Sequence, residues 1–177
     1  PGFGGSCFPK DIKAFSSTAQ KYGLNLSIID SVNISNASRP LKIASKIIDR
    51  FNNNFEDYEI CMLGLSFKPN TADIRDSTSV IIARELIKAG AKIKCFDPKA
   101  MENAKEIIPE LIYCDSVYQA CYNTKALIIA TDWNEFRALD LLKIKQNMAE
   151  PIFFDLRNIY NKEEVSNLGI EYYGIGK

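Results

Sequence analysis

The second two thirds of the chain alternate short apolar runs with helical patterns, and this alternation restricts the fold more than any other feature. The apolar runs cover residues 58–64, 91–96, 111–113, 125–130, 151–155 and 170–173. Amphipathic helical patterns lie between them, and the connections are short. Strands that alternate with helices in this way predict an α/β fold with a doubly wound parallel sheet.

A helical segment precedes the predicted sheet. A first helix is expected to begin near Pro9, because proline suits the first helical turn, and to end near Gly23. A second helical stretch covers about 25–53, and an apolar stripe recurs along it. Within it, Pro40 predicts either a kink or the start of a new helix, with Ser38 as a candidate cap.

The charge balance and the absence of histidine exclude several kinds of function. The chain has 22 basic and 22 acidic side chains and no histidine. A net charge of zero makes nucleic acid a poor candidate partner. Without histidine, the chain alone cannot build a Cys-His or Ser-His-Asp catalytic site or a His-containing metal site. Proton transfer must therefore be carried by Asp, Glu, Lys, Tyr, Cys or water.

The cysteines and the first residues indicate where such a chain works. Five cysteines without CxxC spacing argue against a structural zinc site and predict a reduced, cytoplasmic protein without a bound metal. The chain opens on Pro1-Gly2-Phe3 with no initiator Met and no leader pattern, which predicts a piece of a longer protein rather than a signal peptide. The longest apolar runs, such as 126–130, are too short to span a membrane.

A ligand is expected at the carboxyl ends of the strands, where the strand order reverses. The first strand leads into a loop that contains Lys68 and Arg75, and the strand at 151–155 leads into Arg157. These cations suit a diphosphate, with ordinary loop charge as the alternative. The first strand lacks GxGxxG, so this sheet is not expected to hold NAD in the usual way. Asp97 is interpreted as part of an Asp-Pro turn rather than as a ribose-binding acid.

The stretch 3–9, FGGSCFP, contains the candidate nucleophile. Its two glycines let the backbone approach a ligand closely, and Cys7 comes just before the helix that Pro9 begins. The positive end of a helix and the neighbouring Lys10 both stabilise a thiolate. If the helix starts early enough, Asp11 at i+4 lies beside Cys7 and can orient a water or share a proton. The alternative is a buried structural cysteine, as expected for the other four.

Four segments together resemble the UDP-glucose/GDP-mannose dehydrogenase family. Residues 3–11 resemble its active-site segment, the loop 64–77 resembles a second hallmark, and 96–98 and 154–158 match in order and spacing. The resemblance covers essentially the whole chain and implies the carboxyl-terminal part of such an enzyme. It implies a catalytic-cysteine segment with central dimerisation helices at 1–54 and a Rossmann-like UDP-sugar-binding domain at 55–177. The family's N-terminal NAD-binding domain is absent from this chain.

The resemblance also implies a reaction and roles for single residues. The reaction is the oxidation of UDP-glucose to UDP-glucuronate with two NAD+, in which Cys7 forms a thiohemiacetal and then a thioester while Asp11 assists the proton transfers. The implied substrate-binding residues are Phe3, Gly4, Phe67, Lys68 and Arg157, and Arg75 is implied to contact NAD. The fragment alone is expected to be inactive, to bind the UDP-sugar incompletely and to form a homodimer through the central helix.

Two alternatives to this function stay open. A sister enzyme of the same family would act on GDP-mannose or a UDP-N-acetylhexosamine, although residues 68–71 and 3–11 favour UDP-glucose. The chain would otherwise be a nucleotide-binding or dimerisation module without catalysis. The coding sequence upstream of Pro1 would discriminate between these interpretations, while the pathway, such as polysaccharide biosynthesis, is not determined by the sequence.

Overall fold

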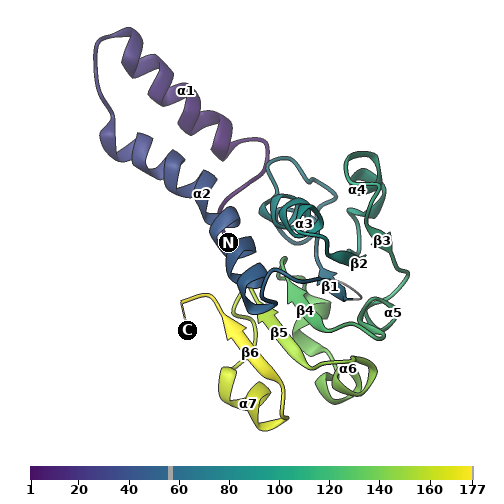
Figure 1. The fold of residues 1–177 in the computed structure, drawn as a ribbon. Coiled ribbons are helices and arrows are strands. Elements are labelled where there is room, and N and C mark those ends of the chain that lie inside the picture. Colours follow the sequence, from purple (N-terminus) through teal and green to yellow (C-terminus); the bar gives the residue numbers. More distant parts are fainter. Residues whose placement is uncertain (56–57, 177) are drawn as a thin grey trace.

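A six-stranded parallel sheet forms the centre of the molecule (Figure 1). The computed structural model describes residues 1–55 and 58–176; residues 56, 57 and 177, which the sequence assigns to the second domain, lie outside the described residues. The strand order is β3-β2-β1-β4-β5-β6, so the winding reverses between β1 and β4. The predicted α/β fold with a doubly wound parallel sheet is confirmed. The strands are β1 (Glu59–Leu63), β2 (Lys92–Phe96), β3 (Ile112–Tyr113), β4 (Ala126–Ile129), β5 (Ile152–Asp155) and β6 (Glu171–Gly174).

The helices lie between the strands as predicted. The sequence pattern over 138–146 predicts one helix, but α6 (Leu141–Asn147) begins only after Asp140, whose side chain accepts a hydrogen bond from the Lys143 amide and caps it; a separate 3₁₀ helix at 134–138 precedes it. The helical elements of the described residues are α1 (Phe8–Lys21), α2 (Ser27–Arg50), α3 (Thr78–Lys88), α4 (Met101–Ile107), α5 (Val117–Cys121), η1 (Asn134–Ala138), α6 (Leu141–Asn147) and α7 (Lys162–Asn167).

Two apolar clusters cover the two faces of the sheet. Side chains alternate along β1, so that Ile60 and Met62 belong to one cluster and Cys61 and Leu63 to the other. The first cluster is closed by α2, α3 and α4, and the second by α5, η1, α6 and α7. Strands that are buried on both faces explain why the apolar runs of the sequence are nearly continuous.

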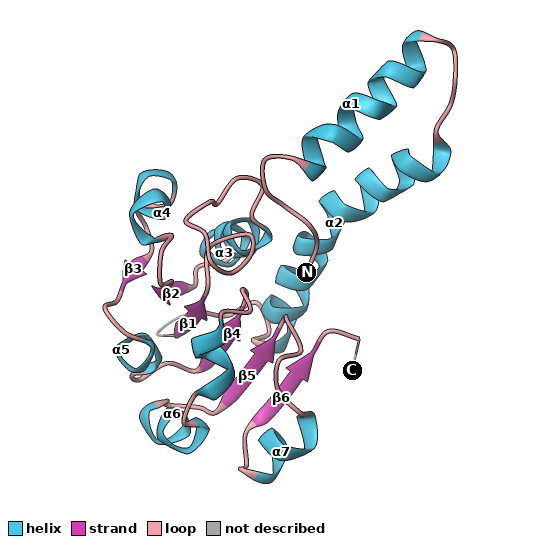
Figure 2. Ribbon diagram, turned by 180° about the vertical axis from the view of Figure 1, so that it is seen from behind, coloured by secondary structure: helices cyan, strands magenta, loops and turns pink. Residues whose placement is uncertain are grey.

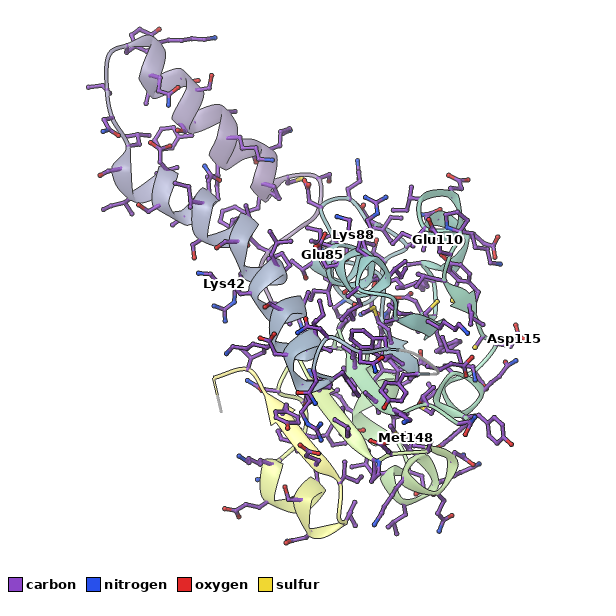
Figure 3. The ribbon with its side chains drawn as sticks, in the orientation of Figure 1. Lys42, Glu85, Lys88, Glu110, Asp115 and Met148 are labelled. Carbon is purple, nitrogen blue, oxygen red and sulfur yellow. The ribbon has the colours of Figure 1, made fainter. Side chains whose placement is uncertain are left out.

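The carboxyl-terminal half of α2 is part of the sheet domain's core. The predicted apolar stripe of Ile43, Ile47 and Phe51 is buried in the first cluster, together with residues of β4 and β5. A cleft of about 580 Å³ separates this part of α2 from the ends of β5 and β6, and Lys42 lies along it (Figure 3). At the end of α2, Arg50 Nε donates to the Glu171 carboxylate of β6 at 2.9 Å.

The helix α2 runs without interruption through Pro40. The interpretation that Pro40 begins a new helix is therefore wrong, and Ser38 is no cap: its hydroxyl donates to the Ser35 carbonyl, one turn earlier in the same helix, at 3.1 Å. Proline removes only the hydrogen bond to the carbonyl of Asn36, and Pro40 itself is buried. Packing of the following turns against the sheet compensates for that loss.

The helices α1 and the first half of α2 form a hairpin that projects from the sheet domain (Figure 2). The helix α1 begins at Phe8 with Pro9 in its first turn, as predicted, and the Ser16 hydroxyl donates to the Asp30 carboxylate across the hairpin. Many apolar side chains stay exposed here, among them Phe15, Tyr22, Leu24, Ile28 and Ile34. Among the described residues, no helix has the length and apolar character needed to cross a membrane.

Candidate functional site

Residues 2–7, the N-terminal segment, run between α2 and the loop that leaves β1. From α2, the Asn36 side chain contacts both polar groups of Phe3: its Oδ1 accepts from Phe3 N at 2.9 Å and its Nδ2 donates to Phe3 O at 3.0 Å. On the other side, Gly5 N donates to the carbonyl of Arg75 at 2.8 Å. Three hydrogen bonds therefore hold this segment against the body of the molecule.

The glycines of this segment let its backbone approach the loop 64–77 closely. A Cβ atom on Gly4 would lie 2.3 Å from the carbonyl oxygen of Asp76, and one on Gly5 would lie 2.7 Å from the Phe67 ring. Gly5 also has φ +89°, where side chains are disfavoured. The expected close approach is thus real, but its object is the loop 64–77, which we call the β1 exit loop.

Cys7 occupies the N-cap position of α1 and is exposed. The alternative that Cys7 is a buried structural cysteine is therefore wrong. Its Sγ lies 3.7 Å from Ser6 Oγ, and its carbonyl accepts the first helical hydrogen bond from Asp11 N at 2.9 Å. The Asp11 carboxylate is 65% exposed and lies 3.6 Å from Lys10 Nζ. A thiol, a carboxylate and an ammonium group thus share one exposed helical turn.

The β1 exit loop is held in place by the buried carboxylate of Asp97, at the end of β2. One carboxylate oxygen accepts from the amides of Leu65 and Ser66 at 2.7 and 3.1 Å and from Trp133 Nε1 at 3.2 Å. The other accepts from the amides of residues 99 and 100, which is the predicted Asp-Pro turn. Both oxygens are occupied by protein donors, so this acid serves to position the loop that carries Phe67 and Lys68.

Each candidate phosphate-binding cation already has a contact within the chain. Lys68 Nζ lies 5.3 Å from the centroid of the Phe67 ring. Arg75 forms two hydrogen bonds to Asp73, at 2.7 and 3.0 Å, and these lower the pKa of the Asp73 carboxyl below its usual value. These residues lie on the β1 exit loop, beside the N-terminal segment.

Arg157 comes from a different strand end and pairs with Asp132, after β4, at 2.7 Å. Among the described residues, that Asp132 oxygen is buried and makes no hydrogen bond of regular geometry, so the ion pair is its main polar contact. Since β1, β4 and β5 are neighbours in the sheet, the predicted exits do meet at one edge. A ligand phosphate at this edge would compete with Asp132 for Arg157.

The contacts that position this site have little or no signal in the sequence. Asn36 stands in a helix and nothing in the local pattern marks it, because its partner Phe3 is 33 residues away. Asp132 follows a strand and so had a detectable signal, as the acid nearest to the exit that carries Arg157. Asp97 was noticed, but its bonds to the β1 exit loop depend on the pairing of β1 with β2.

The other four cysteines are buried, as expected of packing residues. Burial raises the pKa of Cys95 to about 12 and raises the pKa of Cys61 and Cys114 above the usual thiol value. These thiols stay protonated at neutral pH and are shielded from reagents. Cys7 is thus the exposed thiol of the chain.

The described residues contain neither a cluster of metal ligands nor a glycine-rich dinucleotide loop after β1. They contain no group of three or more Cys, Asp or Glu placed to hold a metal. The turn after β1 reads Gly64-Leu65-Ser66, without the glycine fingerprint, and its amides are bound to Asp97. Arg75 is the one residue of this chain that the family resemblance assigns to NAD.

Comparison with protein families matches two parts of the chain. Residues 61–162 match the UDP binding domain of the UDP-glucose/GDP-mannose dehydrogenase family, and residues 1–38 match the central domain of the same family. The UDP-glucose 6-dehydrogenase of Rhizobium meliloti is 41% identical over 100% of this chain, and that of Rickettsia bellii is 39% identical over 99%. The chain spans about two fifths of these relatives, 40% and 41% of their lengths.

Solved structures agree with this assignment. A UDP-glucose dehydrogenase from Pyrobaculum islandicum has a TM-score of 0.74 at 31% identity, over 86% of this chain and 37% of its own. A UDP-D-ManNAc dehydrogenase from Pyrococcus horikoshii has a TM-score of 0.79 at 25% identity, over 99% of this chain and 39% of its own. The family match over more than half of the chain and the relatives' identity over its full length show that the chain belongs to the UDP-glucose/GDP-mannose dehydrogenase family.

Proposed function

We propose that this chain is the carboxyl-terminal part of an NAD-dependent dehydrogenase that oxidises UDP-glucose to UDP-glucuronate. One observation carries the proposal: the N-terminal segment holds an exposed cysteine at a helix N-terminus, beside the loop of Phe67 and Lys68. The names of the relatives, UDP-glucose 6-dehydrogenases over the full length of this chain, support the substrate. The division at 54/55 into a catalytic-cysteine segment with central helices and a UDP-sugar-binding domain is part of this proposal.

In the proposed reaction, Cys7 acts on a sugar that has been oxidised to the aldehyde. The thiolate attacks C6, the C–S bond forms, and the carbonyl oxygen takes a proton to give a thiohemiacetal. Loss of hydride from that carbon to NAD+ and of the hydroxyl proton to a base gives a thioester, and water then releases the acid and regenerates the thiol. Asp11, one turn along α1 from Cys7, would accept a proton from the attacking water. No histidine is needed for these steps.

The remaining site residues bind substrate in this proposal. Phe3 and Gly4 line the sugar site, Phe67 and Lys68 contact the nucleotide-sugar, and Arg157 exchanges Asp132 for a phosphate or sugar oxygen. NAD+, held by a further domain, would accept the two hydrides. Within this chain, Arg75 is the residue that would reach its pyrophosphate.

Substitution of Cys7 tests the chemistry. In a dehydrogenase that contains this chain, Cys7→Ser should stop NADH production before the acid forms, because a serine hydroxyl is a far weaker nucleophile than a thiolate. Ser6→Ala, one residue away, is the matched control and should keep most of the activity. Full turnover by the serine variant would contradict the assignment.

Binding to the isolated chain tests the domain assignment. Titration calorimetry should detect weak binding of UDP or UDP-glucuronate and little binding of NAD, because the described residues offer cations at the strand ends but no dinucleotide loop. Arg157→Ala should weaken UDP binding, whereas Arg137→Ala, which removes the other cation beside Asp132, should not. Tight NAD binding without UDP binding would refute the assignment.

A homodimer through α2 is also part of the proposal. Ile28 and Val32 are exposed on one side of α2 and line a shallow groove with Ser27, Ser31 and Ser35. A second copy would cover these apolar side chains. Light scattering should show a dimer that Ile28→Asp dissociates, while a monomeric parent chain would argue against it.

Five free cysteines also suit the reducing cytoplasm proposed for this protein.

The identity of the sugar rests on sequence rather than on fold. The UDP-D-ManNAc dehydrogenase structure has a TM-score of 0.79, which is slightly higher than the 0.74 of the UDP-glucose dehydrogenase structure. An enzyme of this family acting on GDP-mannose or a UDP-N-acetylhexosamine would therefore have the same architecture. Steady-state assays with these three sugars decide the matter, and we expect UDP-glucose to give the highest kcat/KM.

A further inference from the structure

Asn36 makes an unusual pair of contacts for a residue on a helix. Its amide side chain binds both the N–H and the C=O of Phe3, at 2.9 and 3.0 Å, in the way that a neighbouring strand would. Both polar groups of one peptide position are therefore satisfied by a single side chain. Asn36 is half-buried, and a Cβ on Gly2 would lie 2.9 Å from its Oδ1.

The carrier of this side chain is firmly attached to the sheet domain. Seven residues after Asn36, Ile43 belongs to the buried core cluster, and Ala44, Ile47 and Phe51 follow it there. Pro40 lies in between and is buried as well. The position of Asn36 is therefore set by the packing of α2 on the sheet rather than by the projecting hairpin.

Asn36 and the Arg75 carbonyl form hydrogen bonds to the N-terminal segment from two sides. Asn36 holds Phe3, and the Arg75 carbonyl holds the amide of Gly5 at 2.8 Å. Only Ser6 separates Gly5 from Cys7. Because α1 is otherwise joined to the molecule mainly through the hairpin, these contacts decide where the start of α1 stands relative to Phe67 and Lys68.

We propose that Asn36 is a positioning residue for Cys7: it fixes the peptide of Phe3 and thereby holds the thiol against the β1 exit loop. The inference rests on the proposed function in that Cys7 is taken as the nucleophile. A displacement of about 1 Å at a reacting atom can reduce the rate about 100-fold. A side chain that touches neither substrate nor thiol can thus affect kcat.

Hydrogen exchange tests the mechanical part without any activity. In the 177-residue chain, Asn36→Ala should speed exchange of the Phe3 amide, which loses its acceptor, and also of the Gly5 amide, which does not touch Asn36. The matched control is Asn33→Ala, the same change one turn earlier on α2. We expect the Gly5 amide to exchange about 10-fold faster in Asn36→Ala and at an unchanged rate in Asn33→Ala. Unchanged exchange at Gly5 would overturn the proposal.

Turnover tests the catalytic part. In a dehydrogenase that contains this chain, Asn36→Ala should lower kcat about 10- to 100-fold while KM for the UDP-sugar changes less than about 3-fold. Asn36→Asp has the same size and keeps the acceptor for Phe3 N, so it should retain more activity and covers the case in which the alanine variant fails to fold. Equal kcat for Asn36→Ala and Asn33→Ala would overturn the proposal. If Cys7→Ser is fully active, the proposed function fails instead, and the exchange result stands independently.

Discussion

The sheet domain and the projecting hairpin are stabilised in opposite ways. In the sheet domain, every strand except the short β3 buries apolar side chains, and two clusters close both faces. In α1, the buried residues are Pro9, Ser16 and Ala19, while Phe8 and Phe15 are more than half exposed. The hairpin is therefore held by individual polar contacts, among them Ser16–Asp30, Asn36–Phe3 and Gly5–Arg75.

The two regions carry different parts of the candidate site. The candidate nucleophile Cys7 stands in the weakly held region, whereas the loops of Lys68 and Arg157 leave buried strands. Segments with few buried contacts open at low free energy, and sites that need adjustment are drawn from them. The sheet domain acts as the fixed reference against which the start of α1 is placed.

The same substitution in the two regions should give the largest contrast. Ile82→Ala in α3 removes a fully buried side chain and should lower the free energy of unfolding by about 3 kcal/mol. Ile28→Ala in α2 removes one that is 78% exposed and should change it by less than about 0.5 kcal/mol. Urea titration measures both. Similar losses would mean that the hairpin is buried in solution, as a dimer would require at the concentration used.

Removal of the Asp97 carboxylate should show how far the sheet domain supports the site. Asp97→Ala leaves several buried donors without an acceptor and should lower the free energy of unfolding by about 2–3 kcal/mol. It should also weaken UDP binding, since the loop of Phe67 and Lys68 loses its anchor. The matched control is Asp115→Ala, an exposed acid after β3. A stable variant with unchanged UDP affinity would contradict the role of this anchor.

Alkaline pH should destabilise the sheet domain through its thiols. The folded-state pKa of Cys95 is raised to about 12, so the folded protein keeps a proton that the unfolded chain releases above its ordinary thiol pKa of about 8.5. The stabilisation is fully present below that pH and falls by about 1.4 kcal/mol per pH unit for each such thiol as pH rises towards the folded pKa. Cys95→Ala should flatten the slope between pH 9 and 10. An unchanged slope would show that this thiol is not protected by burial.

The ion pair between the end of α2 and β6, within the sheet domain, should have the smallest effect of these changes. Hydrogen bonds from Arg50 and Tyr173 lower the pKa of Glu171, so its contribution is present above the unfolded value of about 4.3 and is lost as pH falls through the folded value. Glu171→Gln should remove less than about 1 kcal/mol at pH 7, because the pair is half-exposed and screened.

A pair within one helix is the control for that prediction. Glu85 and Lys88, labelled on α3 in Figure 3, form an i,i+3 pair at 2.6 Å that does not join two elements. Glu85→Gln should lower the free energy of unfolding by about 0.3 kcal/mol. It should not change the solvent exposure of the cleft between α2 and the ends of β5 and β6. If both variants behave alike, Arg50–Glu171 is not a tether between α2 and β6.

Much of the fold could be predicted from periodicity alone. The apolar runs gave every strand to within about two residues, because strands buried on both faces leave a continuous signal. Glycine and proline marked the ends of α1, and the stripe of Ile43 and Ile47 identified the buried side of α2. Within α3, periodicity predicts a core side of Val80, Ile81, Ala83, Leu86 and Ile87. Val80, Ala83 and Leu86 are buried, and Ile82, outside that set, is fully buried as well.

The contacts that place the site could not be predicted in this way. Ser77 stands at the N-cap position of α3, but its hydroxyl caps no amide and donates to the Leu65 carbonyl at 2.7 Å, across the turn of the β1 exit loop. Asn36 finds Phe3 only after α2 has docked on the sheet. Such partners are chosen by tertiary packing, and a single sequence carries no local sign of them.

The glycines of the N-terminal segment have a consequence for genetic variation. At Gly4 and Gly5 the neighbouring Asp76 carbonyl and Phe67 ring already occupy the place of a side chain. Even alanine at either position would displace the N-terminal segment before Cys7 from the β1 exit loop, although neither glycine has a reactive side chain. Variant screens should find substitutions at Gly4 and Gly5 as poorly tolerated as those at Cys7. A map of mutational sensitivity would therefore mark the site partly at residues that are needed because they have no side chain.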